Sequence, residues 1–118
     1  MMEQLTGTHL RYLLAIHELT QSGETVSSVR VAQQLQVSKP SVTRMLGILT
    51  ERELVDKERY GKVCLSPAGR EAAERYQDQL TRLMERIPAL GLPLDSASTR
   101  AAAEALAAVL PERCLREV

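Results

Sequence analysis

The sequence predicts a mainly helical fold: a winged helix-turn-helix with a two-stranded wing, followed by further helices. Residues 6–53 contain three stretches in which apolar side chains recur at helical spacing, each preceded by Ser or Thr. Residues 54–66 change to two short strand-like runs around a glycine. Residues 67–118 return to helical spacing. The expected order is therefore three helices, two strands and three helices.

The first predicted helix covers residues 6–22. Thr6 or Thr8 can cap it, because a hydroxyl oxygen accepts a hydrogen bond from an N–H group that has no partner in the first turn. Gly23 stands directly after the last turn, where a glycine commonly ends a helix.

The next two helices have the spacing of a helix-turn-helix. The first of them covers residues 28–35 behind Ser27 or Ser28, and its small residue Ala32 lets two steeply crossed helices approach each other. Its buried edge is expected to consist of Val29, Ala32 and Leu35. Val37 is expected to fill the turn between the two helices.

The third helix begins after the cap residue Ser38 and runs to about Glu53. Pro40 is tolerated because N–H groups of the first turn have no acceptor within the helix. The apolar face of this helix consists of Val42, Met45, Leu46 and Leu49.

Residues 54–66 predict a β-hairpin, with Gly61 supplying the positive φ that a tight turn requires. Ser66 then caps a helix that opens with Pro67 and runs to Ile87. Prolines and a glycine interrupt the chain at Pro88, Gly91 and Pro93. A helix over residues 97–109 and a short one after Pro111 follow.

The third helix carries hydroxyls and cations away from its apolar face, which favours DNA binding. The N-terminal residues of such a helix reach base edges in the major groove, and hydroxyls and cations also bind phosphates. An arginine such as Arg44 can donate two hydrogen bonds to guanine. The predicted DNA-binding residues are Ser38, Lys39, Pro40, Ser41, Thr43 and Arg44 on the helix, and Arg59 and Lys62 on the wing.

Composition excludes several other classes of function. The chain has 118 residues and no net charge, so it is not a general polycation. No apolar run approaches the length of a membrane span and no signal peptide is visible, so we expect a cytoplasmic protein. No nucleophile paired with a base, phosphate loop or pair of catalytic carboxylates is apparent, so we do not expect an enzyme.

Three segments resemble the iron- and manganese-dependent repressors of the diphtheria toxin repressor and manganese transport regulator family. They are Tyr12 with Ile16 and Leu19, then "VRVAQQLQVSKPSVTRMLGILTERELV", and then "YGKVCLSPAGR". The resemblance implies a homodimeric repressor that binds a double-stranded DNA operator through residues 1–66 and dimerises through the helices of residues 67–118. No segment resembles the SH3-like domain of longer members.

The sequence departs from that family at the positions where the resemblance implies metal ligands. These positions are Arg11, Leu14, Leu80, Ala107 and Ala108, with Glu104 beside the last two. Apart from that glutamate, none of them offers a side chain that suits Mn²⁺ or Fe²⁺. We therefore expect no metal cofactor at the family's site.

Two alternative functions remain open at this stage. A winged helix can also be a protein-interaction module without DNA binding. A regulator could instead respond to a small ligand or to oxidation of Cys64 and Cys114, which are too far apart in sequence for a metal-binding CxxC pattern. Cys64 is expected on the strand face opposite Val63 and Leu65.

Overall fold

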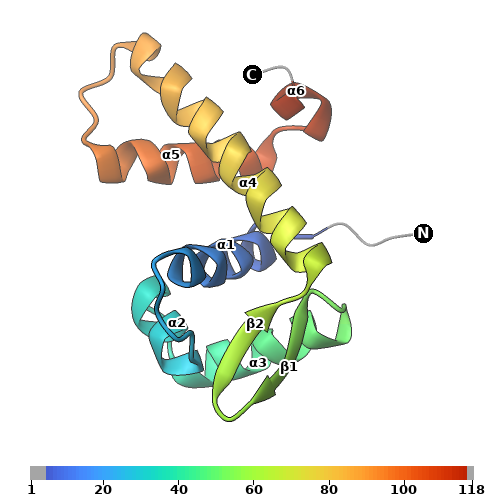
Figure 1. The fold of residues 1–118 in the computed structure, drawn as a ribbon. Coiled ribbons are helices and arrows are strands. Elements are labelled where there is room, and N and C mark those ends of the chain that lie inside the picture. The colour runs from blue at the N-terminus through green and yellow to red at the C-terminus, as the bar shows by residue number, and fades with distance from the viewer. Residues whose placement is uncertain (1–4, 117–118) are drawn as a thin grey trace. The chain divides into compact units, whose positions relative to one another are not determined.

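The computed structural model describes residues 5–116, apart from the side chains of residues 57–59 and 112. The chain divides into two compact units, which we call the N-terminal unit (residues 1–74) and the C-terminal unit (residues 75–118). The N-terminal unit contains α1 (Gly7–Gln21), α2 (Ser28–Leu35), α3 (Lys39–Glu51), β1 (Val55–Arg59), β2 (Lys62–Leu65) and the start of α4 (Pro67–Arg86) (Figure 1). The C-terminal unit contains the rest of α4, a 3₁₀ turn η1 (Ile87–Leu90), α5 (Ser96–Val109) and α6 (Glu112–Arg116).

The predicted order of three helices, two antiparallel strands and three helices is confirmed, and the 3₁₀ turn is the one addition within the described residues. Sequence reasoning placed the third helix two residues too long, because α3 ends at Glu51 and Glu53 adopts a positive φ of 60°. Among residues 5–116, no helix combines the length and apolar character needed to cross a membrane.

The first three helices each begin at a hydroxyl side chain. Thr6, Ser27 and Ser38 each accept a hydrogen bond from the backbone N–H three residues further on. At α1 the arrangement is reciprocal, since Nδ1 of His9 accepts the N–H of Thr6 at 3.2 Å. These caps satisfy N–H groups that the helices themselves cannot.

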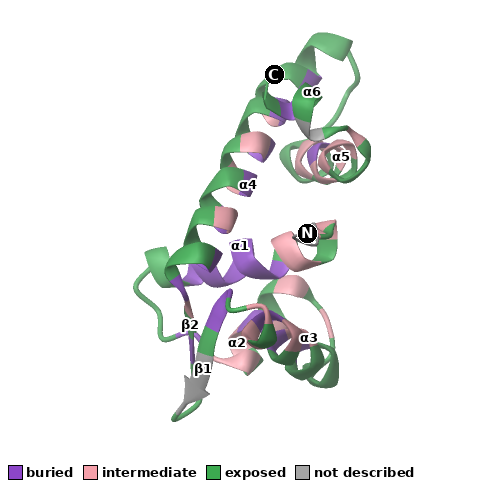
Figure 2. Ribbon diagram, turned by 90° about the vertical axis from the view of Figure 1, so that its right-hand side faces the viewer, coloured by how far each residue is buried: buried purple, intermediate pink, exposed green. Residues whose placement is uncertain are grey.

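The core of the N-terminal unit is formed by α1, α2, α3 and both strands. Leu13 and Ile16 of α1 are completely buried, and much of that helix has the colour of buried residues in Figure 2. The remaining buried members of this core are Tyr12, Leu19, Val26, Val31, Val42, Leu46, Leu49, Leu54, Val55, Val63 and Ala73. The apolar face predicted for α3 is confirmed, although Met45 is only partly buried.

The predicted buried edge of α2 was wrong at one position. Val29 is 45% exposed, whereas Val31, which was not selected, is completely buried. Successive helical residues are 100° apart, so Val31 and Leu35 lie within 40° of each other while Val29 lies 160° from Val31. Ala32 and Leu35 are partly buried against the core, so the inward face is centred between Val31 and Ala32.

The turn between α2 and α3 is made by a left-handed residue, Gln36, with φ of 56°. The N–H of Val37 then returns to the carbonyl of Ala32 at 3.1 Å. Val37 is partly buried against the core, which agrees with its predicted position in the turn.

The wing is a two-residue hairpin. Arg59 pairs with Lys62 across the turn, and the two residues between them, Tyr60 and Gly61, both have positive φ (54° and 75°). Positive φ at both central residues is the condition for a type I′ turn, which matches the twist of the strands. A left-handed conformation costs a residue with a Cβ roughly 1–2 kcal/mol, so Gly61 fits this turn and Tyr60 does not.

The start of α4 is linked to the residues that follow α3 through one serine. The hydroxyl of Ser66 donates to the carbonyl of Glu53 at 2.7 Å and accepts the N–H of Gly69 at 3.1 Å. Its own N–H donates to the carbonyl of Leu54 at 3.1 Å. Gly69 lies so close to that carbonyl that a Cβ would collide with it, which explains the glycine in "SPAG".

The C-terminal unit has few buried residues of its own. They recur along α4 and η1 at Tyr76, Leu80, Leu83 and Ile87, and α5 and α6 add Ala103 and Leu115. The large apolar side chains of Leu90, Leu92, Leu94 and Val109 are exposed. Asp95 caps α5, accepting the N–H of Ser98 at 2.7 Å.

Candidate nucleic-acid interface

The first turns of α3 present the side chains selected from the sequence. Ser38, Lys39, Pro40, Ser41, Thr43 and Arg44 are all exposed. The buried face of α3 points in other directions, because Val42, Leu46 and Leu49 fix the helix against the core. The fold therefore brings these six residues together on one exposed end of one helix.

The two serines at this helix start are linked to each other. The hydroxyl oxygens of Ser38 and Ser41 are 2.8 Å apart, and the oxygen of Ser38 also accepts the N–H of Ser41 at 3.3 Å. One of the two hydroxyl hydrogens is therefore used within the helix cap, and the other can be donated to an outside acceptor. Exposed N–H groups and the positive end of the helix dipole favour an anion at the same place.

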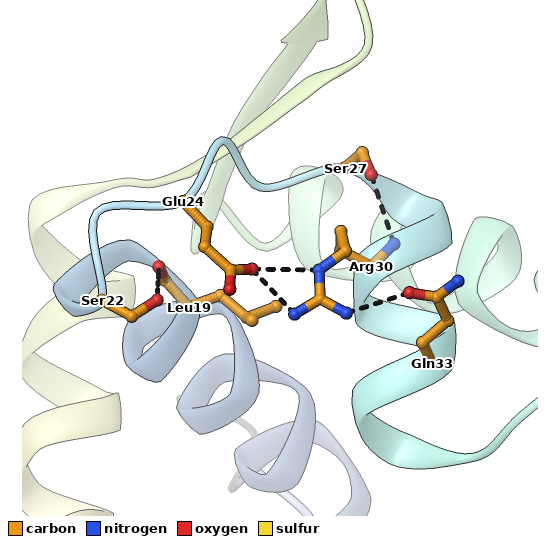
Figure 3. A network of polar contacts seen from close by, with 6 residues as sticks. All are labelled: Leu19, Ser22, Glu24, Ser27, Arg30 and Gln33. Atoms are coloured by element: carbon orange, nitrogen blue, oxygen red, sulfur yellow. Dashed lines mark hydrogen bonds and ion pairs between the residues drawn. The ribbon is translucent and has the colours of Figure 1, made fainter.

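Four cationic side chains of the N-terminal unit make no hydrogen bond or ion pair with another described residue: Lys39, Arg44, Lys62 and Arg70. Arg30 of α2 is different (Figure 3). Its Nε and Nη2 donate to one carboxylate oxygen of Glu24 at 2.9 and 2.7 Å, and its Nη1 donates to Gln33 at 2.9 Å. The guanidinium of Arg44 keeps all five donors for an outside ligand, whereas three groups of Arg30 are already occupied.

The wing contributes Lys62, which is exposed at the start of β2. The backbone of Arg59 pairs with Lys62, but the side chain of Arg59 lies outside the described residues. Asp56 on β1 is exposed and is the one described carboxylate on the wing strands.

A shallow hollow of about 290 Å³ lies between α3 and the wing. It is lined by Thr43, Leu46, Gly47 and Thr50 of α3 and by Val55 and Val63 of the two strands. The hydroxyl of Thr50 donates its hydrogen to the carbonyl of Leu46 at 2.7 Å, so that hydrogen is not available to a ligand. Gly47 is exposed, and no atom would meet a Cβ placed there.

Sequence reasoning missed two residues of this surface. Gly47 was overlooked because a glycine does not contribute to the apolar or polar spacing of a helix. The destabilisation that a glycine causes inside a helix was a signal that could have singled it out. Tyr60 is fully exposed at the wing tip, and it was passed over because Gly61 was taken to explain the turn.

The described residues do not form a site that suits a divalent metal. No group of three or more His, Cys, Asp or Glu side chains gathers within residues 5–116. At the positions that the resemblance matches to ligands, Leu14 and Leu80 are buried hydrocarbons and Arg11 is exposed. His17 is buried on α1, and its Nε2 has no hydrogen-bond partner. One imidazole nitrogen supplies a single metal ligand, however, and does not complete a metal site.

The two cysteines are both exposed and form no disulfide. Cys64 lies opposite Asp56 in the hairpin, and the exposure of β2 alternates so that Val63 is buried and Cys64 is not. The predicted opposite orientation of Cys64 and Val63 is confirmed.

Comparison with known proteins identifies the family. The model of the iron-dependent repressor N-terminal DNA-binding domain matches residues 4–63, half of the chain. The chain belongs to the iron-dependent repressor family. The matched residues end at Val63 on β2, so they cover α1, α2, α3 and most of the wing. The members of this family are transcription regulators and not enzymes, which confirms that part of the prediction.

Solved structures share the fold. A hypothetical protein from Sulfolobus solfataricus is 23% identical, with a TM-score of 0.68 over 96% of this chain and 85% of its own. The manganese regulator SloR is 25% identical, with a TM-score of 0.77 over 92% of this chain and 50% of its own. IdeR of T. acidophilum is 20% identical, with a TM-score of 0.74 over 98% and 53%. No curated protein matches the chain.

This chain therefore matches about half the length of SloR and of IdeR. These structures confirm the predicted winged-helix fold. The family match confirms that the chain is a DNA-binding regulator, in a family named for its dependence on iron. The description of SloR as a manganese regulator applies to that protein.

Proposed function

We propose that this chain is a homodimeric transcriptional repressor that reads a DNA operator with the first turns of α3. The observation that carries the proposal is the exposed start of α3, where Arg44 has all its donors available beside a capped helix end. Arg44 would bind the O6 and N7 atoms of a guanine in the major groove. Lys39, Lys62 and Arg59 would hold phosphates on either side, together with one serine hydroxyl.

The test separates base reading from charge. Arg44→Ala should weaken binding to an operator selected by the wild-type chain by roughly 1–3 kcal/mol and relax the preference at one base pair per half-site. Arg44→Lys is the matched control: it keeps the charge and loses the two-pronged hydrogen bond. It should recover affinity for random DNA but not the base preference. An unchanged preferred operator in Arg44→Ala would refute the base-reading role.

Lys62→Ala should behave differently. A phosphate contact carries no sequence information, so all DNA sequences should weaken alike. The slope of log affinity against log salt should fall by about 1. Mobility-shift titrations at four salt concentrations would measure this. A chain that shifts no duplex from a random library would instead favour a protein-interaction module.

The proposed dimer is formed by the C-terminal unit. Exposed leucines on a unit with few buried residues favour association with a second copy, because covering them removes apolar surface from water. We take Leu92, Leu94, Leu106, Val109 and Leu110 as the seam. A two-fold dimer would also present two copies of α3 about 34 Å apart, one turn of DNA. Sedimentation equilibrium at micromolar concentration tests this, and a monomer would contradict it.

We further propose that Mn²⁺ and Fe²⁺ do not switch this repressor through the family's site. The donor set does not fit, and at about 4 Å in water a divalent ion and the guanidinium of Arg11 repel by about 2 kcal/mol. Leu14 and Leu80 offer apolar contacts in place of ligands. Calorimetric titration with Mn²⁺, Fe²⁺ and Zn²⁺, with operator affinity followed in metal and in chelator, should detect no effect. Micromolar binding with a tenfold gain in operator affinity would refute this proposal.

A further inference from the structure

Tyr60, at the tip of the wing, is an outlier in two independent ways. Its side chain is 100% exposed, the highest value among the exposed large apolar residues of the described chain. Its backbone has φ of 54°, in the left-handed region. A bulky aromatic residue is uncommon in that region, where glycine, asparagine and aspartate are preferred.

Nothing within the described fold compensates for this placement. The phenol makes no hydrogen bond with another described residue, and its ring buries no area. Asparagine or glycine at this position would make the same turn with less strain. Strained backbone of this kind clusters at functional sites, which favours a role for Tyr60 in contact with a ligand.

We propose that Tyr60 contacts operator DNA from the wing tip, with its ring against a deoxyribose at the minor-groove edge and its hydroxyl donating to a phosphate. This inference rests on the proposed function. The neighbours of Tyr60 favour DNA over a protein partner. Gly61 and Lys62 are exposed, so the described tip offers one ring beside a cation and no apolar patch. Tyrosine hydroxyls are among the groups that bind phosphates, and protein hot spots are instead surrounded by other contacts that exclude water.

The contact of Tyr60 differs from that of Lys62 in a measurable way. The phenol is neutral, so its removal should reduce affinity without changing the salt slope, which depends on the number of phosphates neutralised by cations. Lys62→Ala, which removes a cation next to the tip, should lower that slope by about 1. The two variants therefore distinguish a neutral contact from general electrostatic attraction at the same tip.

The experiment uses Tyr60→Asn and Tyr60→Phe in the full chain, with an operator selected from random duplexes by the wild-type chain. The asparagine variant relieves the turn, so its urea midpoint should be equal to or above that of the wild type. Its operator affinity should fall about tenfold, as expected for the loss of a hydrogen bond to a charged group together with the ring contact. Hydroxyl-radical footprints should lose protection of sugars at the edge of each half-site. The phenylalanine variant should be intermediate.

The outcomes separate the two proposals. Affinity of Tyr60→Asn within twofold of the wild type overturns the role of Tyr60 while the repressor function stands. A wild-type chain that selects no duplex overturns the proposed function and this inference with it. If Tyr60→Asn is less stable than the wild type, Tyr60→Phe decides, because it keeps both ring and backbone. A loss of about threefold or more then supports the phosphate bond, and equal affinity overturns it.

Discussion

The N-terminal and C-terminal units differ in what they expose. Among the described residues, two large apolar side chains are exposed in residues 1–74, namely Val29 and Tyr60, and four are exposed in the shorter residues 75–118. The N-terminal unit has a continuous core drawn from three helices and two strands. Its exposed surface carries cations without partners. The C-terminal unit buries a row of apolar residues on α4 and η1 but leaves Leu90, Leu92, Leu94 and Val109 exposed.

This difference indicates two kinds of binding surface. The positively charged end of α3 is stably folded without a ligand, so DNA can bind and dissociate without unfolding it. Exposed leucines are unfavourable in water at all times, and covering them stabilises the chain itself. The N-terminal unit is therefore suited to reversible binding, and the C-terminal unit to a long-lived partner.

The largest expected effect is on the stability of the N-terminal unit, and two valines of α2 test it. Val31→Ala removes two buried methyl groups from α2 and should lower the free energy of unfolding by about 2 kcal/mol, with a further term for the cavity. Val29→Ala makes the same change two residues away at an exposed position and should change stability by less than about 0.5 kcal/mol. Urea denaturation measures both. Equal losses of stability in the two variants would contradict the assignment of Val31 alone to the buried face of α2.

The second prediction concerns the exposed leucines of the C-terminal unit. Leu92→Ser and Val109→Ser should leave the unfolding of the monomer nearly unchanged, because both side chains are exposed in it. Each should raise the dimer dissociation constant about tenfold or more, since every substitution removes an apolar contact from both copies. Sedimentation equilibrium gives the constant, and Glu85→Ser is an exposed polar control on α4. Unchanged association in both variants would remove these residues from the seam.

Much of the fold could be predicted from the sequence because its signals are local. Ser38 and Ser66 cap the helices that they were expected to cap, and the two strands surround Gly61 as expected. Val29 could not be placed correctly, because two helical faces fit the pattern: Val29 lies about 60° from Ala32, and Val31 lies about 40° from Leu35. Only the position of the core decides which of them is buried.

The candidate site was predicted less completely. The exposure of Ser38, Lys39 and Arg44 followed from the apolar face of α3, so it could be inferred from periodicity alone. The link between the hydroxyls of Ser38 and Ser41 could not, since it depends on side-chain rotation. The hollow beside Gly47 also required the structure, because residues of the helix and both strands meet there only after folding.

A smaller effect is expected at Gly47. Alanine is favoured over glycine in a helix by about 0.8–1 kcal/mol, and a Cβ at this position meets no other atom. Gly47→Ala should therefore stabilise the N-terminal unit by up to that amount. If a DNA backbone enters the hollow between α3 and the wing, the same substitution should lower operator affinity a few-fold. Gly61→Ala is the contrast, because its positive φ should make it destabilising.

The smallest expected effect distinguishes the caps of the two units. Ser38 at α3 is neutral and cannot titrate near neutral pH, whereas Asp95 at α5 is a carboxylate. The N–H of Ser98, and then its hydroxyl, hold the pKa of Asp95 below its ordinary value of 3.8. A lowered pKa in the folded chain means that the contribution of Asp95 to stability is present above pH 3.8. It is lost as the pH falls through the lowered value.

Asp95→Asn is the matched variant, because asparagine caps helices about as well as aspartate and does not titrate. At pH 6 the wild type should be slightly more stable than Asp95→Asn, since the charge also interacts favourably with the helix dipole. Between pH 4 and pH 2 this advantage should disappear, while Ser38→Ala should cost the same at every pH. Urea midpoints of the three chains over this range give the comparison. A wild-type advantage that persists at pH 2 would show that the carboxylate charge is not what stabilises α5.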